Sequence, residues 1–151
     1  MITQYVSSPI GTLKITSDGT SITGVDAAKK KATSHADELT KRCALEIDRY
    51  FAGLSTEFSV PLKAQGTPFQ KSVWKAMSRI APGKTKTYAE IAKDIGRPKA
   101  VRAVGSACGK NPLLIVVPCH RVVGSNGGLG GFSAGLRAKK LLLAREQNSD
   151  K

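Results

Sequence analysis

The chain is organised around residues 111–122, Asn111-Pro112-Leu113-Leu114-Ile115-Val116-Val117-Pro118-Cys119-His120-Arg121-Val122. Five large aliphatic residues stand between two prolines, and the second proline leads directly into a cysteine and a histidine. A run of this length, bounded by residues that cannot continue a helix or a central sheet strand, predicts a buried strand or extended segment. We therefore expect this strand to hold the thiol of Cys119 rigidly at its end.

A cysteine held in this way can act as a nucleophile. Its thiol is only weakly ionised at neutral pH, and it needs a neighbouring base or a positive field to become a thiolate. His120 comes next, but adjacent residues of an extended segment point to opposite sides, so His120 needs a water molecule or a bend in the chain to reach the sulfur. The alternative is a buried structural cysteine beside a surface histidine, and these residues alone do not decide between the two.

The length and composition indicate a small protein of the cytoplasm. A chain of 151 residues with 40% hydrophobic residues forms one compact domain or two small ones that share a core. Residues 1–16 alternate in polarity rather than forming the apolar block of a signal peptide, and no apolar run approaches membrane-spanning length. Three cysteines without a Cys-x-x-Cys pair fit a reducing compartment better than a disulfide framework or a zinc site.

The positive charge lies in one half of the chain. Residues 1–62 contain seven Lys or Arg and seven Asp or Glu, whereas residues 63–151 contain seventeen and four, and so carry the whole net charge of +13. A basic segment beside a neutral one is typical of nucleic-acid binding, because contacts to phosphates and the release of counterions supply most of the sequence-independent affinity. The alternative is a basic surface that is merely solvated.

The first half predicts a small antiparallel sheet followed by a helix. Three segments alternate apolar and polar residues, and turn residues separate them, which indicates a meander of hairpins. A helical pattern follows, with Cys43 on its apolar stripe and Gly53 as its stop. The expected strands are residues 2–7, 13–17 and 21–25, and the expected helix is residues 36–52.

Two capping boxes mark helix starts in the second half. Thr67 to Gln70 combines an N-cap, a proline at the first helical position and a glutamine three residues after the cap. Thr87 to Glu90 repeats the cap and has a glutamate three residues after it. Two short helices across a glycine turn then predict a helix-turn-helix. The expected boundaries are Pro82-Gly83 as the end of the first helix, Ile95 as the end of the second, and Pro98 to about Cys108 for the third.

The last of these helices is unusual for a helix that reads base edges. Residues 100–107 are almost all small, and Arg102 is the one long cation among them. Asn, Gln and Glu, which read bases in a major groove, are absent from it. Such a helix suits close approach to a minor groove, where an inserted side chain can unstack the duplex, so Arg102 would act as a wedge or plug. The alternative is that helix packing explains the small residues and Arg102 is a surface charge.

Taken together, these motifs closely resemble one family. The stretch Pro118 to Val122, preceded by Asn111-Pro112 and by a helix-turn-helix with Tyr88 and Arg102, is similar to the O6-alkylguanine-DNA alkyltransferases, also called methylated-DNA-protein-cysteine methyltransferases. The resemblance is strong over about residues 67–147 and covers the first half in general plan. It implies a mixed α/β (α+β) fold. Residues 1–62 would form an RNase H-like sheet and helix, and residues 63–151 a mostly helical DNA-binding domain.

The resemblance implies a suicide repair reaction. A protein of this family flips an O6-alkylated guanine out of duplex DNA and transfers the alkyl group irreversibly to its own cysteine, here Cys119. The family histidine deprotonates that cysteine through a water molecule and is held by a glutamate of the last helix, which corresponds to His120 and Glu146. A stacked base cannot present its O6 substituent to a buried thiol, so flipping is a physical requirement of this chemistry.

Further positions follow from the same resemblance. Tyr88 would contact the flipped base and its 3′ phosphate, Arg102 would fill the vacated stack, and the helix carrying it would place Ala103 and Ser106 against the DNA. Asn111 would be the hinge between this helix and the active-site strand. The carbonyl groups of Cys119 and Val122 would recognise the guanine exocyclic amine, Ser133 would donate to the alkylated oxygen, and Phe132 and Ala134 would line the pocket wall.

Two other functions remain open on these residues. Alkyltransferase-like lesion sensors share the fold but lack the cysteine, and a cysteine hydrolase would need an oxyanion hole and turnover and would leave the basic half without a use. No cofactor is expected, and no metal, because the three cysteines and two histidines lack the spacing of a tetrahedral site. We expect a monomer whose partner is double-stranded DNA containing O6-alkylguanine, with cooperative binding along DNA left open.

Overall fold

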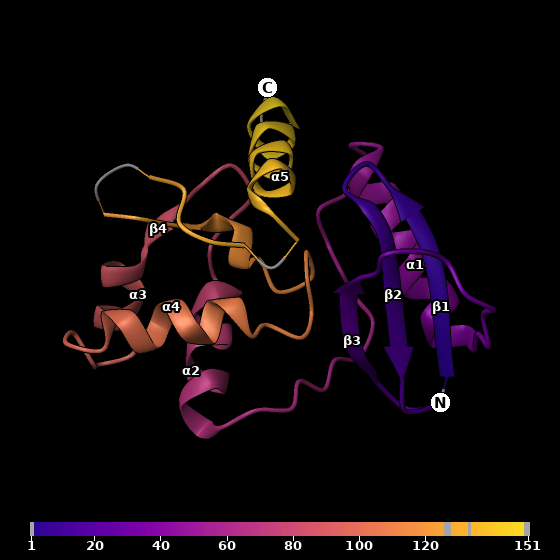
Figure 1. The fold of residues 1–151 in the computed structure, drawn as a ribbon, viewed down its shortest axis with the longest axis horizontal. Helices are drawn as coiled ribbons and strands as arrows, with labels where there is room; N and C mark the ends of the chain where they lie inside the picture. Colours follow the sequence, from indigo (N-terminus) through magenta and orange to yellow (C-terminus); the bar gives the residue numbers. More distant parts are fainter. Residues whose placement is uncertain (1, 126–127, 133, 150–151) are drawn as a thin grey trace. The chain divides into compact units, whose positions relative to one another are not determined.

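The computed structural model describes residues 2–125, 128–132 and 134–149. The chain forms two compact units (Figure 1). The first unit runs to Gln65 and also contains Pro112–Val116, and the second contains Gly66–Asn111 and the chain from Val117 onwards. No helix in the described part of the chain is long and apolar enough to cross a membrane.

The first unit is built on a three-stranded antiparallel sheet. Strands β1 (Ile2–Ser8), β2 (Gly11–Ser17) and β3 (Ile22–Ala27) pair in sequence order, as a meander of hairpins requires. The β2–β3 turn is closed by the Asp18 carboxylate, which accepts the backbone N–H groups of Thr20 and Ser21 at 2.9 and 2.8 Å. The expected strands are confirmed.

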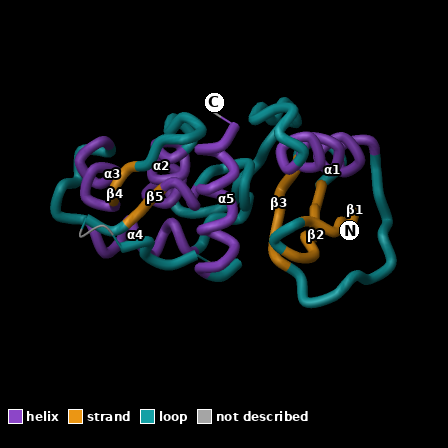
Figure 2. Tube along the Cα trace, turned by 90° about the horizontal axis from the view of Figure 1, so that it is seen from above, coloured by secondary structure: helices purple, strands orange, loops and turns teal. Residues whose placement is uncertain are grey.

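Helix α1 (Glu38–Phe51) covers one face of this sheet (Figure 2). It begins at Asp37, whose side chain accepts the N–H of Thr40 while the Thr40 hydroxyl accepts the N–H of Asp37, and this reciprocal capping box fixes the helix start. Cys43 and Ile47 lie on the buried face of α1 and are fully enclosed. The helix and the core position of Cys43 therefore follow the sequence prediction.

The second unit is mostly helical. Helix α2 (Pro68–Met77) starts with the predicted capping box at Thr67 and is tied to helix α4 (Val101–Gly109) by the Trp74 indole N–H, which donates to the Ala107 carbonyl at 2.9 Å. Helix α3 (Tyr88–Asp94) starts with the second predicted box, and Gly96, at φ +76°, turns the chain towards α4. The helix-turn-helix and the mixed fold class are confirmed.

The remaining elements of this unit are short strands and the last helix. Strands β4 (Lys86–Thr87) and β5 (Val122–Val123) pair in parallel, a 3-10 helix η1 (Cys119–Arg121) precedes β5, and helix α5 (Leu136–Ser149) follows the glycine-rich loop. Helix α5 packs on η1, and this contact brings two segments far apart in the chain together at the cysteine.

The predicted strand through residues 113–117 is wrong. These residues are buried, but they form turns: Ile115 has φ 71°, and Val116 and Cys119 donate to carbonyls only two residues back. Their single strand-like pairing is the bridge from Leu113 to Val25 of β3. A continuous apolar run predicts burial, but it does not predict pairing with a neighbouring strand. The flanking prolines also lack the backbone N–H groups that a longer pairing would need.

Two boundaries also differ from the sequence prediction. Helix α4 begins at Val101 instead of Pro98, because Arg97 to Ala100 forms a closed turn in which the Ala100 N–H donates to the Arg97 carbonyl at 2.9 Å. Helix α2 ends at Met77 instead of continuing to Pro82-Gly83, and Ile80 is buried beyond the end of the helix. The compact units divide after Gln65, while the predicted functional division into residues 1–62 and 63–151 stays a prediction.

Candidate active site

Cys119 lies at the start of η1, directly after Pro118, and is 4% exposed. Burial raises the pKa of its thiol, while a hydrogen bond from the Asn111 side chain and the nearby positive charge of Lys139 lower it. Asn111 is itself fixed, because its amide donates to the Val117 carbonyl at 2.8 Å. The sulfur is therefore held as a neutral thiol in a site that stabilises the thiolate once a base removes the proton.

His120 is buried and contacts a carboxylate from the last helix. Its Nε2 lies 2.6 Å from Oε2 of Glu146, a residue of α5 that is 2% exposed. The site is closed on one side by Phe132, whose ring meets the imidazole edge to face with centroids 6.4 Å apart. The structure thus brings together three predicted residues, His120, Glu146 and Phe132.

The tautomer of His120 follows from its contacts. An ionised carboxylate only accepts hydrogen bonds, so Nε2 carries the proton that it donates to Glu146. Its Nδ1 is buried and has no hydrogen-bond partner among the described residues, which leaves a lone pair free. Burial lowers the pKa of His120, and Arg121 and Lys139 lower it further against the opposing effect of Glu146. The imidazole is therefore neutral at neutral pH and able to take up a proton at Nδ1.

Sequence reasoning missed Lys139, a fully buried cation of α5. Its ammonium group donates to the carbonyl oxygens of Val122 at 2.6 Å, Gly131 at 3.2 Å and Leu129, and so ties the glycine-rich loop to β5. In the sequence Lys139 stands in a basic run that looks solvated. The spacing of the residues could have indicated its burial. Leu142 follows Lys139 by three residues and Glu146 follows Leu142 by four, so the three side chains share one helix face.

Tyr88 packs against this loop at the start of α3. The Lys139 ammonium lies 5.9 Å from its ring centroid, and Gly131 hydrogen-bonds to its hydroxyl through the backbone. Burial raises the pKa of Tyr88, so the phenol stays protonated at neutral pH. Gly130, at φ +72°, approaches the ring so closely that a Cβ at this position would overlap the hydroxyl and lie 2.8 Å from Cε2.

A substitution at Gly130 should therefore slow the reaction at this site. In Gly130→Ala the added methyl group must displace Tyr88 or the loop, and the left-handed backbone adds about 1 to 2 kcal/mol of strain. We expect the rate of the alkyl transfer that the family resemblance implies to fall about tenfold or more, which is about 1.4 kcal/mol in the activation free energy.

The matched control for this variant is Gly131→Ala, since a Cβ on the neighbouring residue meets no atom within 4 Å. Stopped-flow measurement of transfer in both variants checks the prediction. Equal rates in the two would show that Tyr88 does not depend on close approach of the loop.

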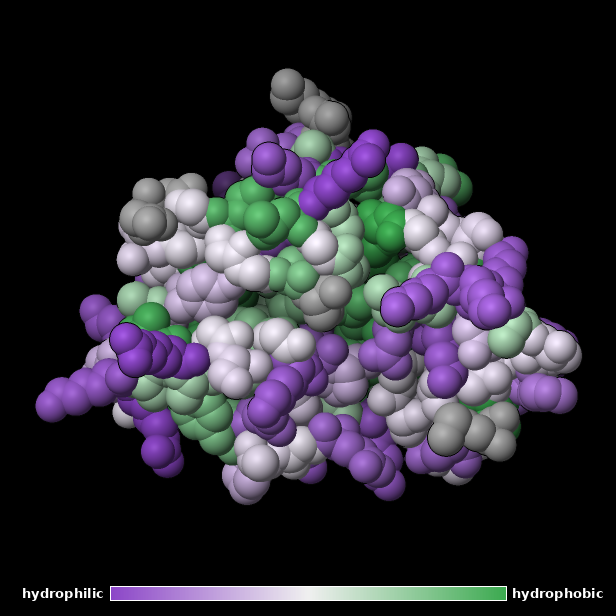
Figure 3. Space-filling model, viewed as in Figure 1, coloured by the Kyte–Doolittle hydropathy of each residue, from purple (hydrophilic) through white to green (hydrophobic). Residues whose placement is uncertain are grey.

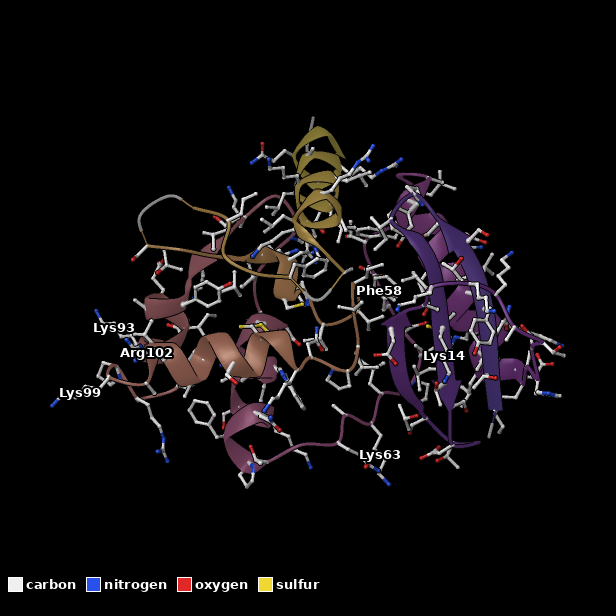
Figure 4. The ribbon with its side chains drawn as sticks, viewed as in Figure 1. Lys14, Phe58, Lys63, Lys93, Lys99 and Arg102 are labelled. Atoms are coloured by element: carbon white, nitrogen blue, oxygen red, sulfur yellow. The ribbon has the colours of Figure 1, made fainter. Side chains whose placement is uncertain are left out.

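The exposed face of α4 carries the residues predicted to contact DNA. Arg102, Ala103 and Ser106 are all exposed. Lys93 of α3 and Lys99 of the connecting turn extend away from the ribbon at the same end as Arg102 (Figure 4), and hydrophilic side chains protrude over this end of the helix-turn-helix (Figure 3). The exposed face of α4 thus carries small side chains, and cationic side chains lie beside them.

Comparison with known proteins identifies the family. A model described as the 6-O-methylguanine DNA methyltransferase DNA binding domain matches residues 68–148, and one described as the ribonuclease-like domain of the same methyltransferase matches residues 1–64. This chain belongs to the 6-O-methylguanine DNA methyltransferase family.

Individual relatives agree with this assignment. The methylated-DNA-protein-cysteine methyltransferase of Haemophilus influenzae is 45% identical over 95% of this chain and 84% of the relative, and that of Methanosarcina acetivorans is 44% identical over 92% and 94%. A crystal structure of Mycobacterium tuberculosis OGT in complex with DNA superimposes with a TM-score of 0.90 at 40% identity, covering 99% of this chain and 94% of that one. The expected family is confirmed.

Two of the remaining predicted site positions, Val122 and Ala134, lie in the described part of the chain. Val122 is buried and its carbonyl accepts the Lys139 ammonium, while Ala134 is half-buried in the turn before α5. Ser133 lies outside the described residues. No group of His, Cys, Asp and Glu in the described part of the chain could hold a metal ion, and Cys43 and Cys108 are buried thiols whose pKa burial raises to about 12.

Proposed function

We propose that this chain repairs O6-alkylguanine in duplex DNA by moving the alkyl group from the base to the sulfur of Cys119. The observation that carries the proposal is the buried thiol at the start of η1, followed by a histidine whose free Nδ1 and Glu146-bound Nε2 suit it to accept a proton. Family membership supplies the substrate class.

The reaction follows from these groups. The thiol loses its proton to Nδ1 of His120, through a water molecule as in the mechanism that the family resemblance implies, and the thiolate attacks the alkyl carbon. The carbon–oxygen bond breaks with its electrons passing to the base. The proton that the thiol gave to His120 then passes through water to the base, so that the product is neutral guanine and His120 is neutral again. A thioether remains, and because no described group in the site is suited to cleave this stable bond, each molecule reacts once.

Recognition of the base uses the pocket around η1. The carbonyl groups of Cys119 and Val122 each already accept one hydrogen bond, from the Val122 N–H and from Lys139, and each has a second lone pair for the exocyclic amine of guanine. Tyr88, held by the loop, would contact the flipped base, and Ser133 would donate to the alkylated oxygen. Phe132 and Ala134 would form the wall beside the alkyl group.

In this proposal, the exposed face of α4 flips the alkylated base out of the duplex. Arg102 would enter the space that the base vacates, while Ala103 and Ser106 allow the helix backbone to come close to the minor groove. The exposed Lys93 and Lys99 suit contacts to phosphates, which would make binding weaken as salt rises. The proposal includes a monomer in the cytoplasm, and the three unpaired buried cysteines fit the reducing compartment.

Mass spectrometry after incubation with a duplex containing O6-methylguanine tests this function. We expect each protein molecule to gain one methyl group, located on the peptide that contains Cys119, and the rate to be unaffected by added metal chelator. A lesion sensor would gain no mass, and a hydrolase would turn over without a lasting adduct, so either result would contradict the proposal.

A further inference from the structure

Arg121 is a buried cation with no assigned part in the reaction. It is 7% exposed, and its guanidinium group uses three nitrogens: Nε donates to Oε1 of Glu146 at 2.8 Å, Nη2 to Oε2 of Glu146 at 2.9 Å, and Nη1 to the Ile80 carbonyl at 2.7 Å. Both oxygens of the carboxylate that holds His120 are therefore also held by Arg121. Such a forked pair fixes the carboxylate in position and keeps it ionised.

Within the hydrogen-bonded group of His120, Arg121 and Glu146, the charges balance when Arg121 is counted. Glu146 contributes one negative charge and Arg121 one positive charge, so the group of three residues is neutral when His120 is neutral. Burying an uncompensated charge costs far more than burying a neutral group, so a site of this kind takes up or loses a proton to remain neutral.

We propose that Arg121 is a positioning residue that keeps the Nδ1 of His120 free to accept the thiol proton, because it compensates the charge of Glu146. This inference rests on the proposed function, in which His120 is the base. The hydrogen bonds of Arg121 described above go to Glu146 and to the Ile80 carbonyl, and not to the sulfur or the imidazole, so Arg121 acts by holding the Glu146 carboxylate and by its charge.

Removing the guanidinium shows why the compensation matters. In its absence the buried pair of His120 and Glu146 has an excess negative charge and binds one proton more readily, as a coupled pair. If the proton resides on the imidazole, Nδ1 is occupied. If it resides on the carboxyl group, that group donates to Nε2 and the histidine proton moves to Nδ1, which is then occupied as well. Either arrangement removes the acceptor that the thiol needs.

The other charged groups around His120 do not replace Arg121. Those that act on the imidazole are Glu146 and Lys139 from α5 and Arg121 from η1, with no charged side chain of α2 among them in the described residues. The Lys139 ammonium group donates its hydrogen bonds to carbonyl groups of the glycine-rich loop and of β5. Its charge also favours the neutral imidazole, but it contacts neither oxygen of Glu146 in the hydrogen bonds described above.

The pH dependence of the reaction tests this role. Arg121→Met removes the charge while keeping an apolar side chain of similar length, and free O6-benzylguanine is the probe, so that DNA affinity does not enter. We expect the acid-side midpoint of the rate profile to rise by about one to three pH units. The rate at pH 7 should fall about tenfold or more and should recover at alkaline pH. A uniform slowing at every pH would overturn the inference, because a purely structural role predicts that result.

Three comparison variants separate charge from geometry. Arg121→Lys keeps the charge but cannot form the fork, so its midpoint should stay near that of the unchanged protein while its plateau rate falls. Arg137→Met removes an exposed charge from α5 and should leave the profile unchanged. The double variant Arg121→Met with Glu146→Gln restores neutrality, so its His120 should again be neutral at pH 7. A raised midpoint in this double variant would contradict the charge argument even if the single variant did not fold.

Nuclear magnetic resonance gives a readout that does not depend on transfer. The chain has two histidines, so the ring nitrogens of His120 can be assigned against His35. We expect an Nε2-protonated neutral ring in the unchanged protein and an Nδ1-protonated or doubly protonated ring in Arg121→Met at pH 7. If the unchanged protein does not react with O6-benzylguanine or with methylated duplex, the proposed function fails. If it reacts and the His120 tautomer does not change on substitution, only this inference fails.

Discussion

Replacing Cys119 with alanine should abolish alkyl transfer while leaving binding to duplex DNA nearly unchanged. The sulfur is the only group at the start of η1 that can form a stable bond to the alkyl carbon, and His120 cannot replace it because its neutral ring is held for proton transfer. The cations and the exposed face of α4 are not altered by the substitution. We expect no detectable adduct and a DNA affinity within about tenfold of the unchanged protein, or about 1.4 kcal/mol.

The matched control is Cys108→Ala. Cys108 is a buried cysteine in the same unit, and its raised pKa of about 12 makes it a poor nucleophile. This variant should still gain one methyl group per molecule, as measured by mass spectrometry with O6-methylguanine duplex. Continued methylation of Cys119→Ala at another residue, or loss of methylation in Cys108→Ala, would show that the acceptor has been assigned to the wrong sulfur.

Replacing Lys139 with methionine should lower both the stability and the rate of transfer. The substitution leaves the carbonyl groups of Val122, Leu129 and Gly131 without their shared donor, and a lost hydrogen bond to a charged group costs about 1.5 to 3 kcal/mol. The loop then no longer holds Tyr88. The thiol of Cys119 also loses the positive charge that lowers its pKa, so less thiolate forms at a given pH.

We expect the free energy of unfolding of Lys139→Met to fall by about 2 kcal/mol or more, and the transfer rate to fall about tenfold or more. Lys140→Met is the control, since Lys140 is the neighbouring residue on α5 and is exposed. Urea denaturation and stopped-flow transfer measure the two effects. If both variants behave alike, Lys139 only fills space, and the loop is held by other contacts.

The local elements of this fold could be predicted from the sequence because their signals are local. The capping boxes at Thr67 and Thr87 specify helix starts through hydrogen bonds between residues three apart, and they occur in the structure as expected. The same holds for the meander, in which alternating polarity and turn residues set the register. The predicted start at Pro98 was wrong because proline suits both a helix start and the tight turn that forms there.

Three features could be predicted from the residues alone: Cys119 is buried beside a histidine, the positive charge belongs to the second half, and a helix of small residues carries Arg102. That residues 113–117 form turns became visible only in the folded chain, since an apolar run predicts burial but not the partner strand that a sheet needs. The tertiary structure also sets the partners of the buried charges. Arg121 and Lys139 resemble surface cations in the sequence, and they are buried because α5 brings Glu146 and Lys139 onto η1 and β5, more than fifteen positions away along the chain. Hydrogen bonds to a carboxylate and to carbonyl groups then offset their desolvation, and such compensation depends on distances in space that residue spacing does not reveal.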